Sequence, residues 1–330
     1  MSLPIPVRLR VLLALVLTAL LTLQPLRAQT KDAWPSQPVK LIVPYAAGGP
    51  TDAFARILAE QWSKQLGVPM LVENRTGAGT VVGTDYAAKA RPDGYTVLLT
   101  TVAHAVNASI VPHLPYRTEQ DFAPVGLAAK APLVLLVTKQ FPARNLGEFL
   151  AYAKEHPGTL NYGSAGNGSA PHVASELLNL MADLKTTHIP YRGTGPAMND
   201  LIGGQISFML DSAATGLTQV RAGNVRLLAT TMRTRLPQTP DTPAIAEAVP
   251  DYEAYTWNAA FVPAGTPATV IGTLNRTLRM ALTDPGLRKR VDEMGLVLES
   301  DPTPQGLAAH LKSEIAKWHD VAQAAKIKVE

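Results

Sequence analysis

The 330-residue sequence contains no cysteine, and this absence removes a whole group of functions. Without thiols the chain cannot form disulfides, thiolate metal sites, a cysteine nucleophile or a lipid-modified N-terminal cysteine. Charged residues are also scarce, at 17% against about 25% in an average globular domain. With 46% apolar residues, the chain is long enough for two ordinary domains and apolar enough to fold around a buried core.

Aromatic residues are equally sparse at 6%, which disfavours a carbohydrate ligand because sugar sites usually need flat stacking surfaces. The net charge is +4, but Arg8, Arg10 and Arg27 lie in the first 28 residues, which contain no acid. The rest of the chain carries 27 basic and 26 acidic residues. A nearly neutral body without a Lys/Arg cluster cannot neutralise a phosphate backbone, so we expect no nucleic-acid partner.

The N-terminus has the pattern of a secretory signal peptide. Arg8 and Arg10 precede an apolar stretch over residues 11–23, and the small residue Ala28 follows. These thirteen residues fall short of the roughly 20 needed to cross a membrane, and no comparable run occurs later. The pattern predicts export to the periplasm and removal of residues 1–28, although the bulky Leu26 leaves the cleavage site open.

Short β-rich runs alternate with helical patterns along the rest of the chain, which predicts an α/β fold with largely parallel sheets. We expect strands over residues 39–44, 70–73, 96–100, 133–138, 160–162, 187–190, 206–210, 225–230 and 257–262. We expect helices over residues 52–66, 81–90, 146–156, 171–181, 196–203, 215–222, 268–282 and 304–325.

Two segments are candidates for crossovers between two lobes of the protein. Over residues 122–138 two apolar strands are separated only by residues 129–132, and residues 232–249 are polar and rich in proline. If both are crossovers, residues 29–128 and 232–330 form a discontinuous first lobe and residues 129–231 form the second. Ligands of α/β sheets bind beyond the carboxyl ends of the strands, so we expect the site in the cleft between the lobes.

Two glycine-rich segments share one design and fall in different predicted lobes. The first glycine loop, residues 43–52, reads VPYAAGGPTD, and the second glycine loop, residues 162–172, reads YGSAGNGSAPH. Each leads from a strand into a helix, the first of which Thr51 or Asp52 can cap, so backbone N–H groups and the helix dipole can meet an anion. A carboxylate suits them better than a phosphate, because neither contains the lysine of a P-loop. The alternative is that the glycines only make tight turns.

Other motifs are weaker. Residues 75–83 contain GxGxxxG, one residue longer than the dinucleotide fingerprint, so we expect a tight turn there with Arg75 solvated or paired locally. Ser164 or Ser169 with His172 and Asp211 would compose a hydrolase triad, but YGSAG is not the GxSxG nucleophile elbow. There is no HExxH, and one helical turn from His172 to Glu176 does not make a metal site. We therefore expect no enzyme activity, metal or cofactor, and His172 is expected to hydrogen-bond its loop.

Along residues 34–327 the sequence resembles the Bug, or TctC-type, extracytoplasmic solute-binding receptors of tripartite tricarboxylate transporters. The motifs that carry the resemblance are VPY (43–45) with Gly48, Gly49 and Asp52, ENR (73–75) with GAG (77–79), RPDGYT (91–96), DFAPV (121–125), YGSAG (162–166) with Gly168, Ser169 and His172, HIPYRG (188–193) and PAGTP (263–267).

The resemblance implies a type II periplasmic-binding-protein fold, in which two α/β lobes joined by crossover strands close on a small carboxylate-containing solute. It implies a monomer that delivers this solute to inner-membrane permease subunits; a receptor serving a sensor kinase, or a hydrolase using Ser164 and His172, are the alternatives. Carried over by position, the site residues are Tyr45, Ala46, Gly48, Gly49, Thr101, Ser164, Gly168, Ser169, Thr194, Gly195 and Asp211.

The sequence departs from the family pattern at two places. Val102 and Ala103 precede His104 where many relatives carry small polar residues, which hints at a less polar far end of the pocket, and Ala182-Asp183 replaces a common glycine turn. The ligand itself stays open, because backbone donors recognise a carboxylate whatever is attached to it.

Overall fold

The computed structural model describes residues 34–327, so the predicted signal peptide, residues 1–28, lies outside the described residues. The chain from Gln37 onward forms one compact unit, to which the following description applies. Its strands are β1 (Val39–Val43), β2 (Met70–Asn74), β3 (Thr96–Thr100), β4 (Phe122–Thr138), β5 (Asn161–Ser164), β6 (Thr187–Pro190), β7 (Phe208–Ser212), β8 (Val225–Thr230), β9 (Tyr255–Pro263) and β10 (Val297–Leu298).

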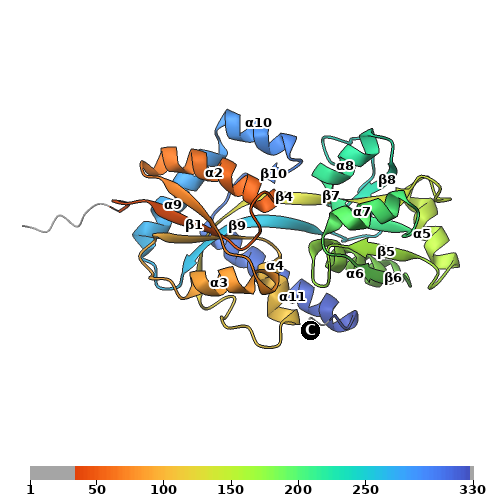
Figure 1. Cartoon of the computed structure of the whole chain (residues 1–330), viewed down its shortest axis with the longest axis horizontal. Coiled ribbons are helices and arrows are strands. Elements are labelled where there is room, and N and C mark those ends of the chain that lie inside the picture. The colour runs from red at the N-terminus through yellow and green to blue at the C-terminus, as the bar shows by residue number, and fades with distance from the viewer. Residues whose placement is uncertain (1–33, 328–330) are drawn as a thin grey trace, which may run out of the picture. The chain divides into compact units, whose positions relative to one another are not determined.

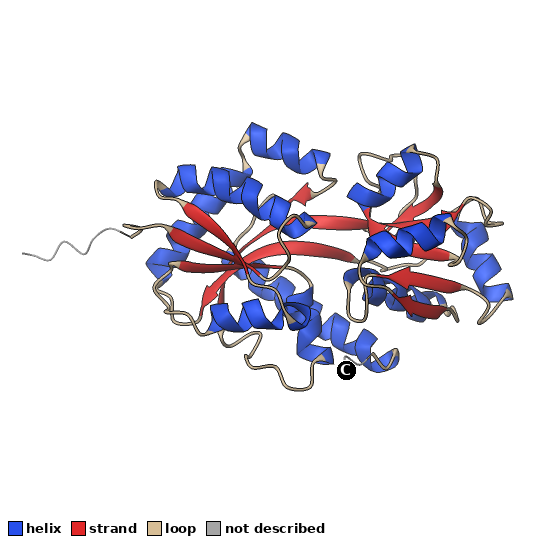
Figure 2. Ribbon diagram, viewed as in Figure 1, coloured by secondary structure: helices blue, strands red, loops and turns tan. Residues whose placement is uncertain are grey.

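Helices lie on both sides of these strands (Figure 2). They are α2 (Pro50–Leu66), α3 (Val81–Ala88), α4 (Ala103–Ile110), α5 (Leu146–Glu155), α6 (Ala170–Ala182), α7 (Thr194–Ile202), α8 (Ala213–Arg221), α9 (Ala268–Leu282), α10 (Pro285–Glu293) and α11 (Pro304–Ala324), with short 3₁₀ helices η1 (Ala78–Thr80) and η2 (Ile245–Glu247). In residues 34–327 no helix is both long enough and apolar enough to span a membrane.

The strands pair in the order β2-β1-β3-β9-β4-β7-β5-β6, and β8 and β10 also pair with β4. Parallel pairing is found at the two ends of this order, where β1 joins β2 and β3, and β5 joins β6 and β7. In the middle, β9 is antiparallel to β3, and β4 is antiparallel to both β9 and β7. The α/β class is thus confirmed, while the expected parallel pairing applies to the outer strands.

The predicted break at residues 129–132 is wrong, because β4 continues for 17 residues (Figure 1). Its first part pairs with β9 as far as Pro132 opposite Tyr255, and from Leu133 onward it pairs with β7 and β8. Pro132 has no N–H group to donate to a neighbouring strand. The strand nevertheless continues through it, because the pairing partner changes from β9 to β7 and β8 at this point and the missing donor is tolerated there. One strand therefore joins the two groups of parallel strands; the boundaries of the two lobes stay a prediction.

Candidate functional site

The first glycine loop leaves the carboxyl end of β1 and enters α2 without a side-chain cap. Gly49 is the N-cap residue and Pro50 occupies the first turn, where its fixed φ and missing N–H are favourable. The predicted capping by Thr51 or Asp52 is therefore wrong, since the helix starts earlier than expected. Asp52 instead reaches back, and its Oδ2 accepts a hydrogen bond from the N–H of Gly48 (2.8 Å). Gly48 has φ +82°, a conformation that favours glycine.

Asp52 is 2% exposed and is the centre of the network that holds this loop. Its Oδ2 also accepts from Arg56 Nε (2.9 Å), and its Oδ1 accepts from Asn74 Nδ2 (2.9 Å). The same amide donates to the carbonyl oxygen of Tyr45 (3.0 Å). Burial alone would raise the pKa of Asp52, but the hydrogen bonds from Arg56, Gly48 and Asn74 outweigh it and lower the pKa. The carboxylate is therefore ionised and fully used inside the protein.

Tyr45 and Thr101, two of the predicted site residues, are in direct contact. Their hydroxyl oxygens are 2.5 Å apart, and the residues follow the adjacent parallel strands β1 and β3. Burial raises the pKa of Tyr45 to about 12, so its phenol stays neutral. The carboxyl ends of these strands thus carry hydroxyl groups beside the first glycine loop.

The second glycine loop follows β5 and enters α6, whose N-cap residue is Ser169. The fully buried Ser164 hydroxyl accepts from the N–H of Gly166 (3.0 Å) and lies 2.6 Å from His188 Nε2. The N–H of Gly168 donates to His172 Nδ1 (3.0 Å), which confirms the expected role of that histidine. Uncharged side chains therefore hold this loop.

The imidazole rings of His172 and His188 stack at a centroid distance of 3.8 Å, and Tyr162 stacks on His188 at 5.0 Å. Burial, and secondarily the neighbouring His188, lowers the pKa of His172 to about 3; burial lowers that of His188 to about 4. Both rings are neutral at neutral pH. The second glycine loop therefore offers an anion no charged side chain from this stack.

The glycine N–H groups of both loops mostly serve the protein itself. Donors inside the loops are the N–H groups of Gly48, Gly49, Gly166, Gly168 and Ser169. Within the described chain, the loop N–H groups that lack a protein acceptor include those of Ala46, Ala47, Ala165 and Asn167. The glycines shape the loops, and their neighbours present free donors. Three of these four residues are absent from the predicted site, because only glycine spacing was visible in the sequence.

The structure brings Asp211 and Thr194 together on the same side as the second glycine loop. Asp211 lies in β7, and Thr194 begins α7 directly after the loop that follows β6. Asp211 Oδ2 accepts from the Thr215 hydroxyl (2.5 Å). Burial raises the pKa of Asp211 to about 6, against the lowering effects of the Thr215 hydroxyl, the Ser212 N–H and the Thr194 hydroxyl nearby. The predicted residue Gly195 has open space where a Cβ would stand.

The alternative of a hydrolase that pairs Ser164 with His172 finds no support in the geometry. Ser164 contacts His188 across the parallel pair β5–β6, and His172 is occupied by the loop N–H. The third member of the imagined triad, Asp211, is hydrogen-bonded to Thr215 rather than to a histidine. The geometry of a hydrolase triad is therefore absent from these residues.

The hint of a less polar pocket rested on Val102 and Ala103; Val102 is buried in the hydrophobic core, while Ala103 is half-buried at the start of α4. His104 is fully buried, with its ring 5.0 Å from that of Phe122 and 5.1 Å from that of Phe261. Core packing accounts for Val102 and for the neighbouring His104, so the less polar far end of the pocket stays a prediction that rests on Ala103.

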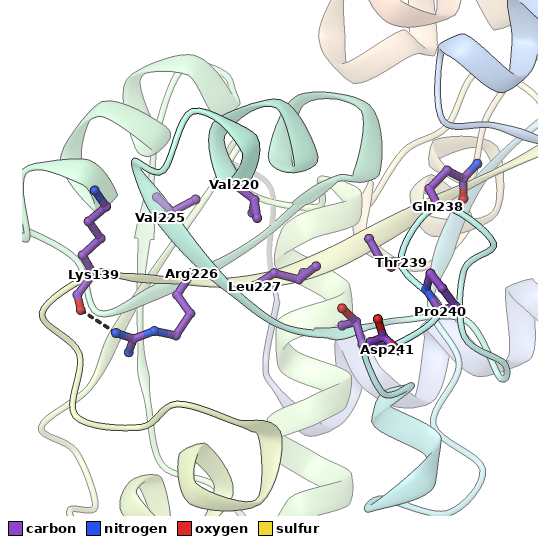
Figure 3. A pocket seen from close by; sticks show the side chains of 10 residues that line it. Lys139, Val220, Val225, Arg226, Leu227, Gln238, Thr239, Pro240 and Asp241 are labelled. Atoms are coloured by element: carbon purple, nitrogen blue, oxygen red, sulfur yellow. Dashed lines mark hydrogen bonds between the residues drawn. The ribbon is translucent and has the colours of Figure 1, made fainter.

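A pocket of about 810 Å³ lies elsewhere, between β8 and the proline-rich segment (Figure 3). Its one arginine, Arg226, donates to the carbonyl oxygens of Lys139, Phe141 and Ala143, so these internal bonds engage its guanidinium. None of the predicted site residues lines this pocket. Across residues 34–327, no group of three or more histidine, aspartate or glutamate side chains could hold a metal ion.

A sequence profile described as "Tripartite tricarboxylate transporter family receptor" matches residues 54–327. The chain belongs to this receptor family. Among relatives of the receptor, a "UPF0065 protein in tcbD-tcbE intergenic region" from Pseudomonas sp. strain P51 is 38% identical over 94% of this chain and 92% of its own length. Protein BugT from Bordetella pertussis is 35% identical over 91% of this chain and 92% of its own length.

Solved structures confirm the periplasmic-binding-protein fold of the receptor. Periplasmic binding protein BugD is 33% identical with a TM-score of 0.76, and the match covers 90% of this chain and 100% of BugD. An R. palustris protein solved with adipate is 34% identical with a TM-score of 0.77, covering 89% and 99%. MatC from Rhodopseudomonas palustris, solved with bound malate, is 35% identical with a TM-score of 0.74, covering 87% and 99%.

Proposed function

We propose that this receptor captures a small carboxylate-containing solute between the two glycine loops and delivers it to the membrane subunits of a tripartite transporter. The observation that carries the proposal is that each loop follows a strand, ends at a helix N-terminus and keeps N–H groups without a protein acceptor. Such donors favour an anion. The relatives solved with adipate and malate support a carboxylic acid as the class of ligand.

Recognition in this proposal is by dipoles rather than by charge. The N–H groups of Ala46 and Ala47 bind the carboxylate from one side and those of Ala165 and Asn167 from the other. Tyr45, Thr101, Thr194 and Asp211 line the remainder. The lobes, residues 29–128 with 232–330 and residues 129–231, close because the closed form adds contacts that the open form lacks. The receptor works as a monomer in the periplasm after removal of residues 1–28.

We propose binding without turnover. The hydroxyl that a hydrolase would use belongs to Ser164, which is fully buried and hydrogen-bonded within its loop. A permease is favoured over a sensor kinase as the partner by the family to which the chain belongs. Incubation with carboxylic esters and amides is expected to release no product; release that is lost in Ser164→Ala would support the enzyme instead.

Thermal unfolding tests the proposal after the protein has been unfolded and refolded to remove any bound ligand. The panel contains mono-, di- and tricarboxylic acids, each with its amide. An acid at a hundredfold excess over its Kd adds about 2.7 kcal/mol, which raises the Tm by about 5–10 °C. The amide is expected to give no shift. A neutral or cationic compound that stabilises the protein while no acid does would refute carboxylate binding.

A matched pair of variants locates the site. Ser164→Ala frees the N–H of Gly166 and the ring of His188, so the second glycine loop loses its support and affinity falls about tenfold. Ser313→Ala removes an exposed serine hydroxyl on α11 and is expected to leave affinity unchanged. Equal affinities of the two variants would remove the second glycine loop from the site.

A further inference from the structure

One oxygen of the Asp211 carboxylate is buried without a partner. The residue is 1% exposed; Oδ2 is engaged by Thr215, but Oδ1 has no hydrogen-bond donor among the described residues. No cationic side chain contributes to its pKa either. Buried polar groups in folded proteins are nearly always hydrogen-bonded, so an isolated carboxylate oxygen indicates a donor that arrives from outside.

The topology places this oxygen's residue at the predicted ligand site. β5 and β7 are parallel, with Gly163 opposite Met209, so Asp211 is level with residue 165 of the second glycine loop. Thr194, at the start of α7, lies close enough for its hydroxyl to influence the pKa of Asp211. The carboxylate therefore stands at the carboxyl edge of the strands, beside the N–H groups proposed to bind the anion.

We propose that the bound solute carries a hydrogen-bond donor, a hydroxyl or an ammonium group, that donates to Asp211 Oδ1 while its carboxylate binds the two glycine loops. This inference rests on the proposed function and narrows its ligand to hydroxy or amino acids. The two sides of the site are complementary to such a molecule, because N–H donors bind the carboxylate and a carboxylate oxygen accepts from the donor. A plain acid would leave Oδ1 unpaired or place a second anion against it.

Calorimetric titration of the wild-type protein at pH 7.5 tests this without any variant. Two matched sets serve as probes: succinate, malate and aspartate, and 3-phenylpropionate, phenyllactate and phenylalanine. In the set that binds, the hydroxy or amino acid is expected to bind about tenfold or more tightly than the plain acid, since a hydrogen bond to a charged group is strong. Equal or tighter binding of the plain acid would overturn the inference while leaving carboxylate capture standing.

Asp211→Asn assigns the preference to this side chain. The variant keeps the shape but loses the charge, so the preference is expected to fall below about threefold with little change in affinity for the plain acid. Asp292→Asn, at an exposed position on α10, is the control and should keep the full preference. A preference that survives in Asp211→Asn would overturn the assignment. If neither these acids nor any acid of the thermal-unfolding panel binds, the proposed function fails and this inference with it; if Asp211→Asn does not fold, the wild-type comparison still decides.

Discussion

The two glycine loops share a backbone plan but are held by opposite chemistry. A buried, ionised carboxylate, Asp52, organises the first glycine loop through Arg56 and Asn74. The second glycine loop depends on Ser164 and on two stacked neutral histidines. In each, side chains accept from glycine N–H groups, Gly48 in the first loop and Gly166 and Gly168 in the second, while neighbouring N–H groups lack a protein acceptor. The same strand–loop–helix backbone can therefore be held in place either by a buried charge or by neutral side chains.

The difference predicts how each loop responds to change. The anchor of the first glycine loop is a charge, and its removal takes a hydrogen-bond acceptor from Gly48, Arg56 and Asn74. The anchor of the second glycine loop is a set of neutral groups that acid would charge. Substitution should therefore damage the first glycine loop more, and mild acid should damage the second.

The largest effect is expected from Asp52→Ala. This change removes three hydrogen bonds from a residue that is 2% exposed, so the free energy of unfolding should fall by about 3 kcal/mol. Urea denaturation monitored by circular dichroism measures the loss. The control is Asp85→Ala, which removes a partly exposed ion pair with Lys89 and should lose about 1 kcal/mol or less. Similar losses in both variants would show that the Asp52 network does not hold the loop.

An intermediate effect is expected from Gly168→Ala in the second glycine loop. Gly168 has φ +72°, and a Cβ there would stand 2.4 Å from Ile110 Cδ1. Gly158, at φ +78°, has nothing within 4 Å, so Gly158→Ala isolates the backbone strain. We expect a loss of about 1 kcal/mol for Gly158→Ala and about 2 kcal/mol for Gly168→Ala, measured by urea denaturation. Equal losses would mean that Ile110 moves aside freely.

The smallest effect is the response to mild acid. Burial lowers the pKa of His172 to about 3 and that of His188 to about 4, below the ordinary value of 6.5, so the unfolded chain binds more protons than the folded one in this range. The free energy of unfolding should thus fall as the pH drops through 6.5 towards 4. From pH 7.5 to 6, His172 alone should contribute a loss of about 1 kcal/mol.

A variant separates His172 from the other titrating groups. Asp211 acts in the opposite direction, because its raised pKa makes the folded protein bind protons more readily. This contribution is common to the wild type and to His172→Gln, so the difference between their pH profiles reports His172. The fall in stability from pH 7.5 to 6 is expected to be about 1 kcal/mol smaller in the variant. Parallel profiles would contradict a neutral His172 in the folded protein.

The sequence pattern located several elements residue for residue, including β6, β8 and α9. In each of them the apolar residues repeat at a regular spacing, or turn residues mark both ends. The pattern predicted neither α4 nor α10, although it predicted the equally short α3, α7 and α8. Only Leu287 and Val291 of α10 are buried, too few apolar residues to show a helical period. It also predicted two strands in place of β4, because a proline usually interrupts a strand. In the structure Pro132 lies where β4 changes its pairing partner, so the strand continues.

The sequence by itself determined the α/β class and the two glycine loops, because alternating periods and glycine spacing are local properties. Only the tertiary structure decided which backbone N–H groups of the loops lack a protein acceptor and which side chains hold the loops in place. Ser164 meets His188 24 residues away, and Asp52 meets Asn74 22 residues away, through the packing of parallel strands. Such partners are chosen by strand register, which acts across the chain and leaves no periodic signal along it.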